Sequence, residues 1–160
     1  MNKELNNIII WAQNKTGVLY RILWLLRRKL FNIESITAGH SEIPDITRIT
    51  ITVLGDNDKV KNICHQLYKL VEVVKVEQVE NRKLVFREMA MMKVLIGDKQ
   101  EKNDVLRTIE HFRGRVINMA KDSLVIEVTG DESKINAFYE NMKDFNILEF
   151  VRTGRTALFK

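Results

Sequence analysis

Asn14-Lys15-Thr16-Gly17 is a short polar run between two apolar ones, and its residue types suit the binding of a small zwitterion. A helix that begins at Gly17 would present free N–H groups to an anion such as an α-carboxylate. Glycine allows a ligand to approach the backbone closely, and Asn14 can both donate to and accept from an α-ammonium group beside its carboxylate. The residues alone leave a second interpretation open, a loop capped only by Thr16 and water.

The rest of the sequence offers no arrangement typical of an active site. The seven glycines form neither a dinucleotide-binding fingerprint nor a phosphate-binding loop. The serines lack the context of a nucleophile elbow. The histidines have neither metal-site spacing nor a nearby cysteine pair; they are His40, His65 and His111. We therefore predict a chain that is not an enzyme and that holds no metal or cofactor of its own.

Charge and hydropathy indicate the kind of partner to expect. The formal net charge is +5, from 26 Lys and Arg against 21 Asp and Glu. Apart from residues 27–29 the basic residues are interspersed with acids, which is typical of a solvated surface, so a protein partner explains the charge as well as nucleic acid does. The apolar run at residues 8–12 is too short to span a membrane or to form a signal-peptide core. We expect a cytoplasmic chain that binds neither nucleic acid nor membrane.

Cys64 is the only cysteine, so it cannot form an internal disulfide. It lies at helical spacing with Val60, Ile63 and Leu67, which predicts a buried thiol in a helix core.

The elements that must position the loop follow the order strand, helix, strand, strand, helix, strand. Strands are predicted from short apolar or alternating runs and helices from apolar residues at helical spacing, with Thr16 as the N-cap of the first helix. The predicted ranges are 8–11, 17–30, 33–38, 49–53, 58–68 and 71–76. Two helices on one face of an antiparallel sheet form the ferredoxin-like arrangement.

The same order recurs in the second half. Gly55-Asp56 returns as Gly130-Asp131, at an offset of 75 residues, which supports duplication. The predicted elements are 91–96, 101–112, 115–119, 123–129, 133–142 and 147–151. The fold class is therefore α+β, with two tandem ferredoxin-like βαββαβ domains at residues 5–79 and 88–160 and a linker at 80–87. No match to the polar loop occurs in the second half.

Tyr20 and Trp24 lie at i and i+4 on the first helix, beside Arg21, Arg27 and Arg28 and away from its apolar stripe. Exposed aromatic residues with arginine suggest a protein contact. Packing between the two domains explains them equally well.

The order of several short segments resembles the small regulatory subunit of acetolactate (acetohydroxyacid) synthase, whose first domain is an ACT domain. The segments span both predicted domains, and the set in this order is specific to that family. They are 14–19 (NKTGVL), 31–37 (FNIESIT), 47–50 (TRIT), 66–73 (QLYKLVEV), 87–89 (REM), 109–114 (IEHFRG) and 151–155 (VRTGR).

The resemblance implies a regulatory subunit that activates a separate catalytic subunit of branched-chain amino-acid synthesis and confers feedback inhibition, typically by valine. Thiamine diphosphate, Mg²⁺ and FAD would belong to that catalytic partner alone. The effector site would lie between two ACT domains of a homodimer. One protomer would contribute the loop wall, and its partner would contribute two residues that follow the first helix. The implied site residues are Asn14, Lys15, Thr16, Gly17, Val18, Leu19, Asn32 and Ile33.

Two departures from the family pattern concern the surroundings of the site. The family commonly has glycine before the aromatic-Asn-Ile segment, whereas Lys29-Leu30 precede Phe31 here, so the helix is expected to end without a left-handed cap. Trp11 is unusual near the loop and would alter the depth of the pocket if it faced the ligand. The alternative function is a free-standing amino-acid-responsive regulator with an ACT domain that binds nucleic acid.

Overall fold

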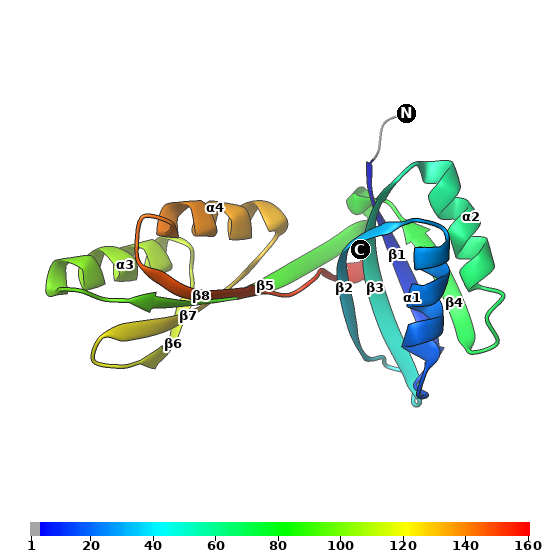
Figure 1. Cartoon of the computed structure of the whole chain (residues 1–160), viewed down its shortest axis with the longest axis horizontal. Coiled ribbons are helices and arrows are strands. Elements are labelled where there is room, and N and C mark those ends of the chain that lie inside the picture. Colours follow the sequence, from blue (N-terminus) through cyan, green and yellow to red (C-terminus); the bar gives the residue numbers. More distant parts are fainter. Residues whose placement is uncertain (1–3) are drawn as a thin grey trace. The chain divides into compact units, whose positions relative to one another are not determined.

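The computed structural model describes residues 4–160, which divide into two compact units. Unit 1 comprises the chain up to Phe86 together with Gly154–Lys160, and unit 2 comprises Arg87–Thr153. Each unit consists of an antiparallel sheet with two helices on one face (Figure 1).

The sheet of unit 1 has the strand order β2-β3-β1-β4, so β2 and β4 are its edges. Helices α1 and α2 cover one face (Figure 1). The elements are β1 (Glu4–Gln13), α1 (Val18–Arg28), β2 (Asn32–His40), β3 (Ile46–Gly55), α2 (Asn57–Leu67) and β4 (Val73–Val79).

The apolar run of β1 lies in the middle of this sheet and is buried on both faces. Because successive side chains of a strand point to opposite faces, Ile8 and Ile10 pack in the core beneath the helices, while Ile9 and Trp11 belong to a second cluster on the other face. Trp11 therefore does not face the loop. This double burial explains why β1 is continuously apolar rather than alternating.

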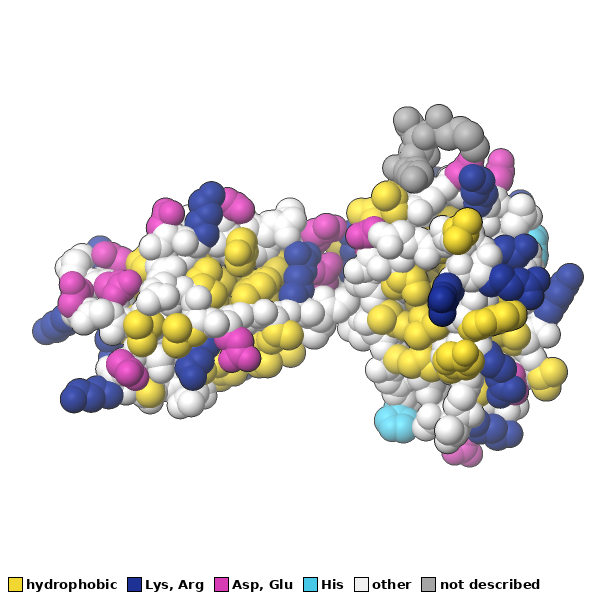
Figure 2. Space-filling view, viewed as in Figure 1, with side chains coloured by type: hydrophobic (Ala, Val, Ile, Leu, Met, Phe, Trp, Pro, Cys, Tyr) yellow, Lys and Arg dark blue, Asp and Glu magenta, His cyan; other side chains and the backbone are white. Residues whose placement is uncertain are grey.

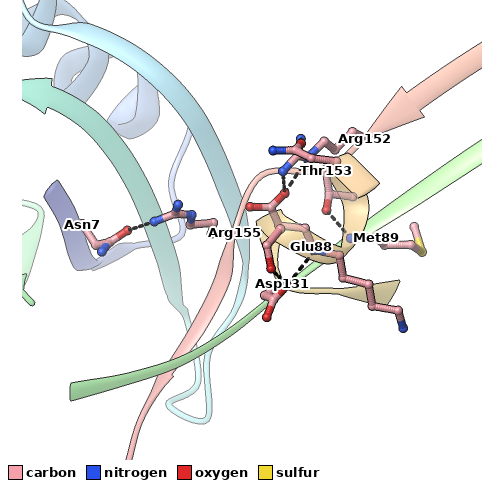
Figure 3. A network of polar contacts seen from close by, with 10 residues as sticks. Asn7, Glu88, Met89, Asp131, Arg152, Thr153 and Arg155 are labelled. Carbon is pink, nitrogen blue, oxygen red and sulfur yellow. Dashed lines mark hydrogen bonds and ion pairs between the residues drawn. The ribbon is translucent and has the colours of Figure 1, made fainter. Parts of the chain in front are cut away.

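The last residues of the chain cover the helix-free face of this sheet. Strand β9 (Thr156–Phe159) pairs with the start of β5 (Leu84–Leu95), and Phe159 stacks on Trp11 with 6.3 Å between ring centroids. Arg48 on β3 donates to the carbonyl of Ala157 at 2.8 Å. Arg155 is buried and donates to the side chain of Asn7 at 3.3 Å (Figure 3).

Unit 2 repeats the plan with the strand order β6-β7-β5-β8. Its core lies between the sheet and helices α3 and α4, and includes Phe138, Ile126 and Met92. An ion pair between Arg152 and Glu88 joins β8 to β5 (Figure 3). The remaining elements are the 3-10 turn Asn81–Lys83, α3 (Lys99–His111), β6 (Arg115–Met119), β7 (Ser123–Gly130), α4 (Glu132–Met142) and β8 (Ile147–Arg152).

The fold class predicted from the sequence, α+β with two ferredoxin-like repeats, is confirmed. The duplication is visible at the start of the second helix of each unit, where Asp56 and Asp131 cap helices that begin at equivalent positions. Asp56 accepts from the N–H of Asp58 at 3.0 Å, and Asp131 accepts from the N–H of Lys134 at 2.9 Å.

Two differences between the observed and the predicted boundaries concern the division into domains. Strand β5 already begins at Leu84, inside the predicted linker. Residues 154–160, which the prediction assigned to the C-terminal domain, cluster with unit 1, because β9 and Arg155 bury their contacts there. A segment of so few residues carries too little sequence periodicity to reveal which sheet it joins.

Both predicted helix caps of α1 are wrong. The N-cap is Gly17, with φ of 84°, and no side chain caps the helix, so Thr16 does not play the expected role. At the other end Leu30 does adopt the left-handed conformation, with φ of 57°. The N–H of Leu30 donates to Arg27 and that of Phe31 donates to Leu26, which is the Schellman pattern usually built on glycine.

Candidate functional site

Helix α1 begins differently from the other three α-helices in the described part of the chain. Helices α2, α3 and α4 each have an aspartate N-cap whose carboxylate accepts a backbone N–H, and each has an acidic residue in its first turn. Helix α1 has neither. Its positive end is therefore not neutralised by the protein, which favours an anionic group from outside.

The loop before α1 is held in place by backbone hydrogen bonds. The N–H of Gln13 donates to the carbonyl of Glu72 at 2.8 Å, and the N–H of Asn14 donates to the carbonyl of Asp45 at 2.7 Å. The N–H of Val18 makes a long bond of 3.3 Å to Lys15 within the turn. The free N–H groups at this end of the helix, which include those of Gly17 and Leu19, are the donors that can face a ligand.

Gly17 is needed for its backbone conformation rather than for space. Its φ of 84° lies in the left-handed region, and a Cβ at this position would meet no atom within 4 Å. The space beside Gly17 is thus open, and only the left-handed backbone angle disfavours most other residues at this position.

A cavity of about 340 Å³ opens beside this loop, at the small end of the range of about 300–1,000 Å³ for small-molecule sites. Its apolar part includes Ala12, Val18 and Ile49, and its polar part includes Asn14 and Lys15. The wall opposite the helix comes from the end of β2 and the start of β3. The remaining lining residues are Gln13, Leu19, Ala38, Gly39, His40 and Thr47.

The structure separates the predicted site residues into two groups. Asn14, Lys15, Val18 and Leu19 line the cavity, and Thr16 and Gly17 belong to the same loop without lining it. Asn32 and Ile33 line a different hollow, at the other end of α1. Because α1 has 11 residues, about 16 Å of helix lies between the two groups within one chain. A single small amino acid cannot contact both groups of the same protomer.

Asn32 lies exposed at the start of β2, and its side-chain Nδ2 donates to Oε1 of Glu34 at 2.6 Å. Strand β2 pairs with β3 with Asn32 opposite Leu54 and His40 opposite Thr47. The two ends of β2 therefore carry the two groups of candidate residues.

Sequence reasoning missed the wall formed by Ala38, Gly39 and His40. The strand predicted from the sequence ends at Ala38, and His40 lies beyond it as one of three scattered histidines. Only the pairing of β2 with β3 brings these residues to the cavity. The unbroken run from the predicted strand through Gly39 to His40 was the one sequence signal that could have suggested a longer strand.

Tyr20 and Trp24 project from the exposed side of α1, where their side chains are 70% and 46% exposed. The guanidinium of Arg28 lies 5.3 Å from the centre of the Trp24 ring. Packing within unit 1 therefore does not cover them. Figure 2 shows Lys and Arg side chains gathered over this helical side of unit 1.

The structure also bears on the cysteine, on metal binding and on membrane-spanning helices. Burial raises the pKa of the Cys64 thiol to about 11, which confirms the expected buried cysteine. Among residues 4–160, no group of His, Cys, Asp and Glu side chains could hold a metal ion. No helix in that range is long and apolar enough to cross a membrane.

Two family models match the chain. Residues 8–75 match the ACT domain found in small subunits of acetohydroxyacid synthase (AHAS), and residues 87–160 match the small subunit of acetolactate synthase.

Curated relatives and a solved structure agree with these models over the whole length. The probable acetolactate synthase small subunit of Methanothermobacter thermautotrophicus is 41% identical over 99% of this chain and 94% of its own. That of Bacillus subtilis is 40% identical over 94% of this chain and 87% of its own. The crystal structure of the Thermotoga maritima acetolactate synthase small subunit superimposes with a TM-score of 0.91, at 38% identity and 98% coverage of both chains.

Proposed function

The chain belongs to the family of acetolactate synthase small subunits, which regulate rather than catalyse, and we propose that it controls a catalytic partner by binding a branched-chain amino acid, with valine as the first candidate. The uncapped positive end of α1 beside a small, partly apolar cavity is the observation that carries this proposal. The expected setting is the cytoplasm.

The effector site is shared by two copies of the chain. Asn14 and Asn32 are too far apart in one protomer to hold one amino acid, but β2 is an edge strand with an unpaired row of backbone groups. If two β2 strands pair antiparallel around a two-fold axis at Ile36, Asn32 of one copy lies opposite His40 of the other. Asn32 and Ile33 then approach the cavity wall formed by Ala38, Gly39 and His40.

In this arrangement the effector carboxylate faces the N–H groups of Gly17 and Leu19. Its ammonium group contacts the side chains of Asn14 and of Asn32 from the second copy. The branched side chain packs against apolar groups, including Ile33 of the second copy. A backbone N–H bond to a charged group contributes about 1.5–3 kcal/mol, so two of them account for much of the affinity of a small effector.

Inhibition requires that the activating conformation binds the effector less tightly than the inhibited one. An effector shifts an equilibrium only by its difference in affinity for the two states. A coupling of about 1–3 kcal/mol between the effector site and the partner-binding surface is an ordinary value. Thiamine diphosphate, Mg²⁺ and FAD serve the reaction in the catalytic subunit, and this chain contributes regulation alone.

Calorimetric titration of the purified chain with valine, leucine and isoleucine tests the proposal. Valine should bind the homodimer, and Asn32→Ala should abolish binding and inhibition while activation of the catalytic subunit is retained. The variant Asn62→Ala, an exposed asparagine on α2 outside both groups of candidate residues, serves as the control. Absence of binding by all three amino acids would contradict the proposed function.

The exposed aromatic pair of α1, Tyr20 and Trp24, is the proposed contact with another protein, either the second copy or the catalytic subunit. Trp24→Ala should weaken one of these two associations by about tenfold, because buried aromatic residues dominate interfaces. Unchanged dimerisation in sedimentation, together with unchanged binding of the catalytic subunit, would exclude the contact.

Family models and relatives match the small subunit along the whole chain. They favour this assignment over the alternative of a free-standing regulator that binds nucleic acid.

A further inference from the structure

The cavity beside α1 offers positive charge to the carboxylate of a zwitterion but no negative charge to its ammonium group. Its lining includes the lysine Lys15 and lies at the positive end of a helix. No aspartate or glutamate is among the lining residues. A countercharge for an ammonium group must therefore come from outside the cavity of one protomer.

Glu34 is the carboxylate attached to the second half of the site. Its Oε1 accepts from Nδ2 of Asn32 at 2.6 Å, and both side chains are exposed on the same side of β2. None of the ion pairs found among residues 4–160 involves Glu34. Its negative charge thus has no cationic partner within the described protomer.

The bond to Glu34 also fixes which atom Asn32 can offer a ligand. An ionised carboxylate only accepts hydrogen bonds, so the amide must turn its NH₂ group toward Glu34. The oxygen Oδ1 is then free to accept from an ammonium group. Without Glu34 the amide could turn over and present a donor, which would repel that group.

The backbone supports this orientation of Glu34. The pairing of β2 with β3 shifts register between Ile33 and Ser35, so Glu34 has no residue opposite it on β3. A bulge of this kind redirects the side chain of the extra residue and is frequent beside functional sites. Glu34 is therefore an extra residue of the edge strand, and its side chain is exposed like that of Asn32.

We propose that Glu34 makes the shared site selective for an amino acid over the 2-oxo acid with the same carbon skeleton. Glu34 accepts from the ammonium group of the effector and orients Asn32 to do the same. A 2-oxo acid has the same carboxylate and side chain, but its carbonyl oxygen would face the Glu34 carboxylate and Asn32 Oδ1. This inference rests on the proposed effector site.

Titration of the homodimer with valine and with 3-methyl-2-oxobutanoate, both by calorimetry, tests the selectivity. The wild-type chain should prefer valine by about 100-fold, because the 2-oxo acid loses two hydrogen bonds to the ammonium group, at about tenfold each. In Glu34→Gln the affinity for valine should fall about tenfold, while that for the 2-oxo acid stays the same or rises. Because glutamine keeps an oxygen that can accept from Asn32, Glu34→Ala should lose more affinity for valine than Glu34→Gln.

Glu42→Gln is the matched control, because it removes one exposed carboxylate of unit 1 that lines neither group of candidate residues. It should leave the preference for valine unchanged. Valine binding that needs Asn32 but shows an unaltered preference in Glu34→Gln would overturn the role of Glu34 and leave the proposed function standing. Failure of the wild-type dimer to bind any branched-chain amino acid would overturn the proposed function itself.

Discussion

At the scale of single residues, the two ends of α1 depend on left-handed backbone conformations. Gly17 adopts one before the helix and Leu30 adopts one after it, with φ of 84° and 57°. Glycine tolerates this region freely, whereas a residue with a Cβ is strained by about 1–2 kcal/mol. Leu30 therefore carries strain that a glycine at this position would not.

Leu30→Gly should raise the free energy of unfolding by about 1 kcal/mol, the relieved strain less the added entropy of the unfolded chain. Leu30 is 93% exposed, so few contacts are lost. Urea denaturation measures the change, with Leu30→Ala as the control, since alanine retains the strained Cβ. Equal stability of the two variants would show that the conformation of Leu30 carries no strain.

The contribution of Cys64 to the free energy of unfolding should depend on pH. Burial raises the pKa of its thiol from 9.0 to about 11, so the folded chain retains a proton that the unfolded chain releases first. This contribution to stability is fully present below pH 9 and is lost as the pH rises toward 11. The free energy of unfolding should fall less steeply between these values in Cys64→Ala than in the wild type. Parallel curves for the two chains would contradict the raised pKa.

The residues of the loop could be predicted from the sequence, whereas their backbone conformation could not. Asn14 to Gly17 could be recognised because a polar turn before an amphipathic helix is a local pattern. The N-cap at Gly17 could not be predicted, because Thr16 has the side chain better suited to capping. Only the left-handed φ of Gly17 shows where the helix begins. His40 could not be placed because its position depends on pairing with β3 rather than on its neighbours in sequence.

At the scale of elements, β9 is the strand that its own sequence indicates least, although it covers much of one face of the unit 1 sheet. It spans four residues, yet it covers Ile9 and Trp11 on the helix-free face of the unit 1 sheet. The guanidinium of Arg48 lies close to both aromatic rings, 5.0 Å from the centre of Trp11 and 5.8 Å from that of Phe159. The helices and the other strands followed from hydrophobic periodicity, whereas β9 depends on contacts with residues more than 100 positions away.

Deletion of residues 156–160 should expose Trp11 and lower the free energy of unfolding of unit 1 by about 2 kcal/mol, the value of a large apolar group exposed to water. In a Trp24→Phe background Trp11 is the only tryptophan, so its fluorescence should shift to longer wavelength. Leu158→Ser, on the exposed side of β9, should leave the emission unchanged. Unaltered emission after the deletion would show that β9 does not cover Trp11.

At the scale of the whole molecule, positive charge is concentrated in unit 1. This unit holds 15 of the 26 Lys and Arg residues and 9 of the 21 Asp and Glu residues, a net charge of +6, whereas unit 2 carries −1. The site, the exposed aromatic residues and the edge strand β2 belong to the same unit. The positive charge is therefore concentrated in the unit to which we assign the effector site, the dimer contact and the aromatic contact.

We propose that each effector site takes Asn14 from one protomer and Asn32 from the other. Asn14→Ala and Asn32→Ala homodimers should each fail to bind valine. When the two variants are mixed, unfolded and refolded together, half of the dimers should be mixed, and each of these holds one intact site.

Calorimetric titration of this mixture should recover about one quarter of the wild-type number of valine sites, at wild-type affinity. Recovery of no sites would contradict the account, because a site contained within one protomer cannot be restored by exchanging partners.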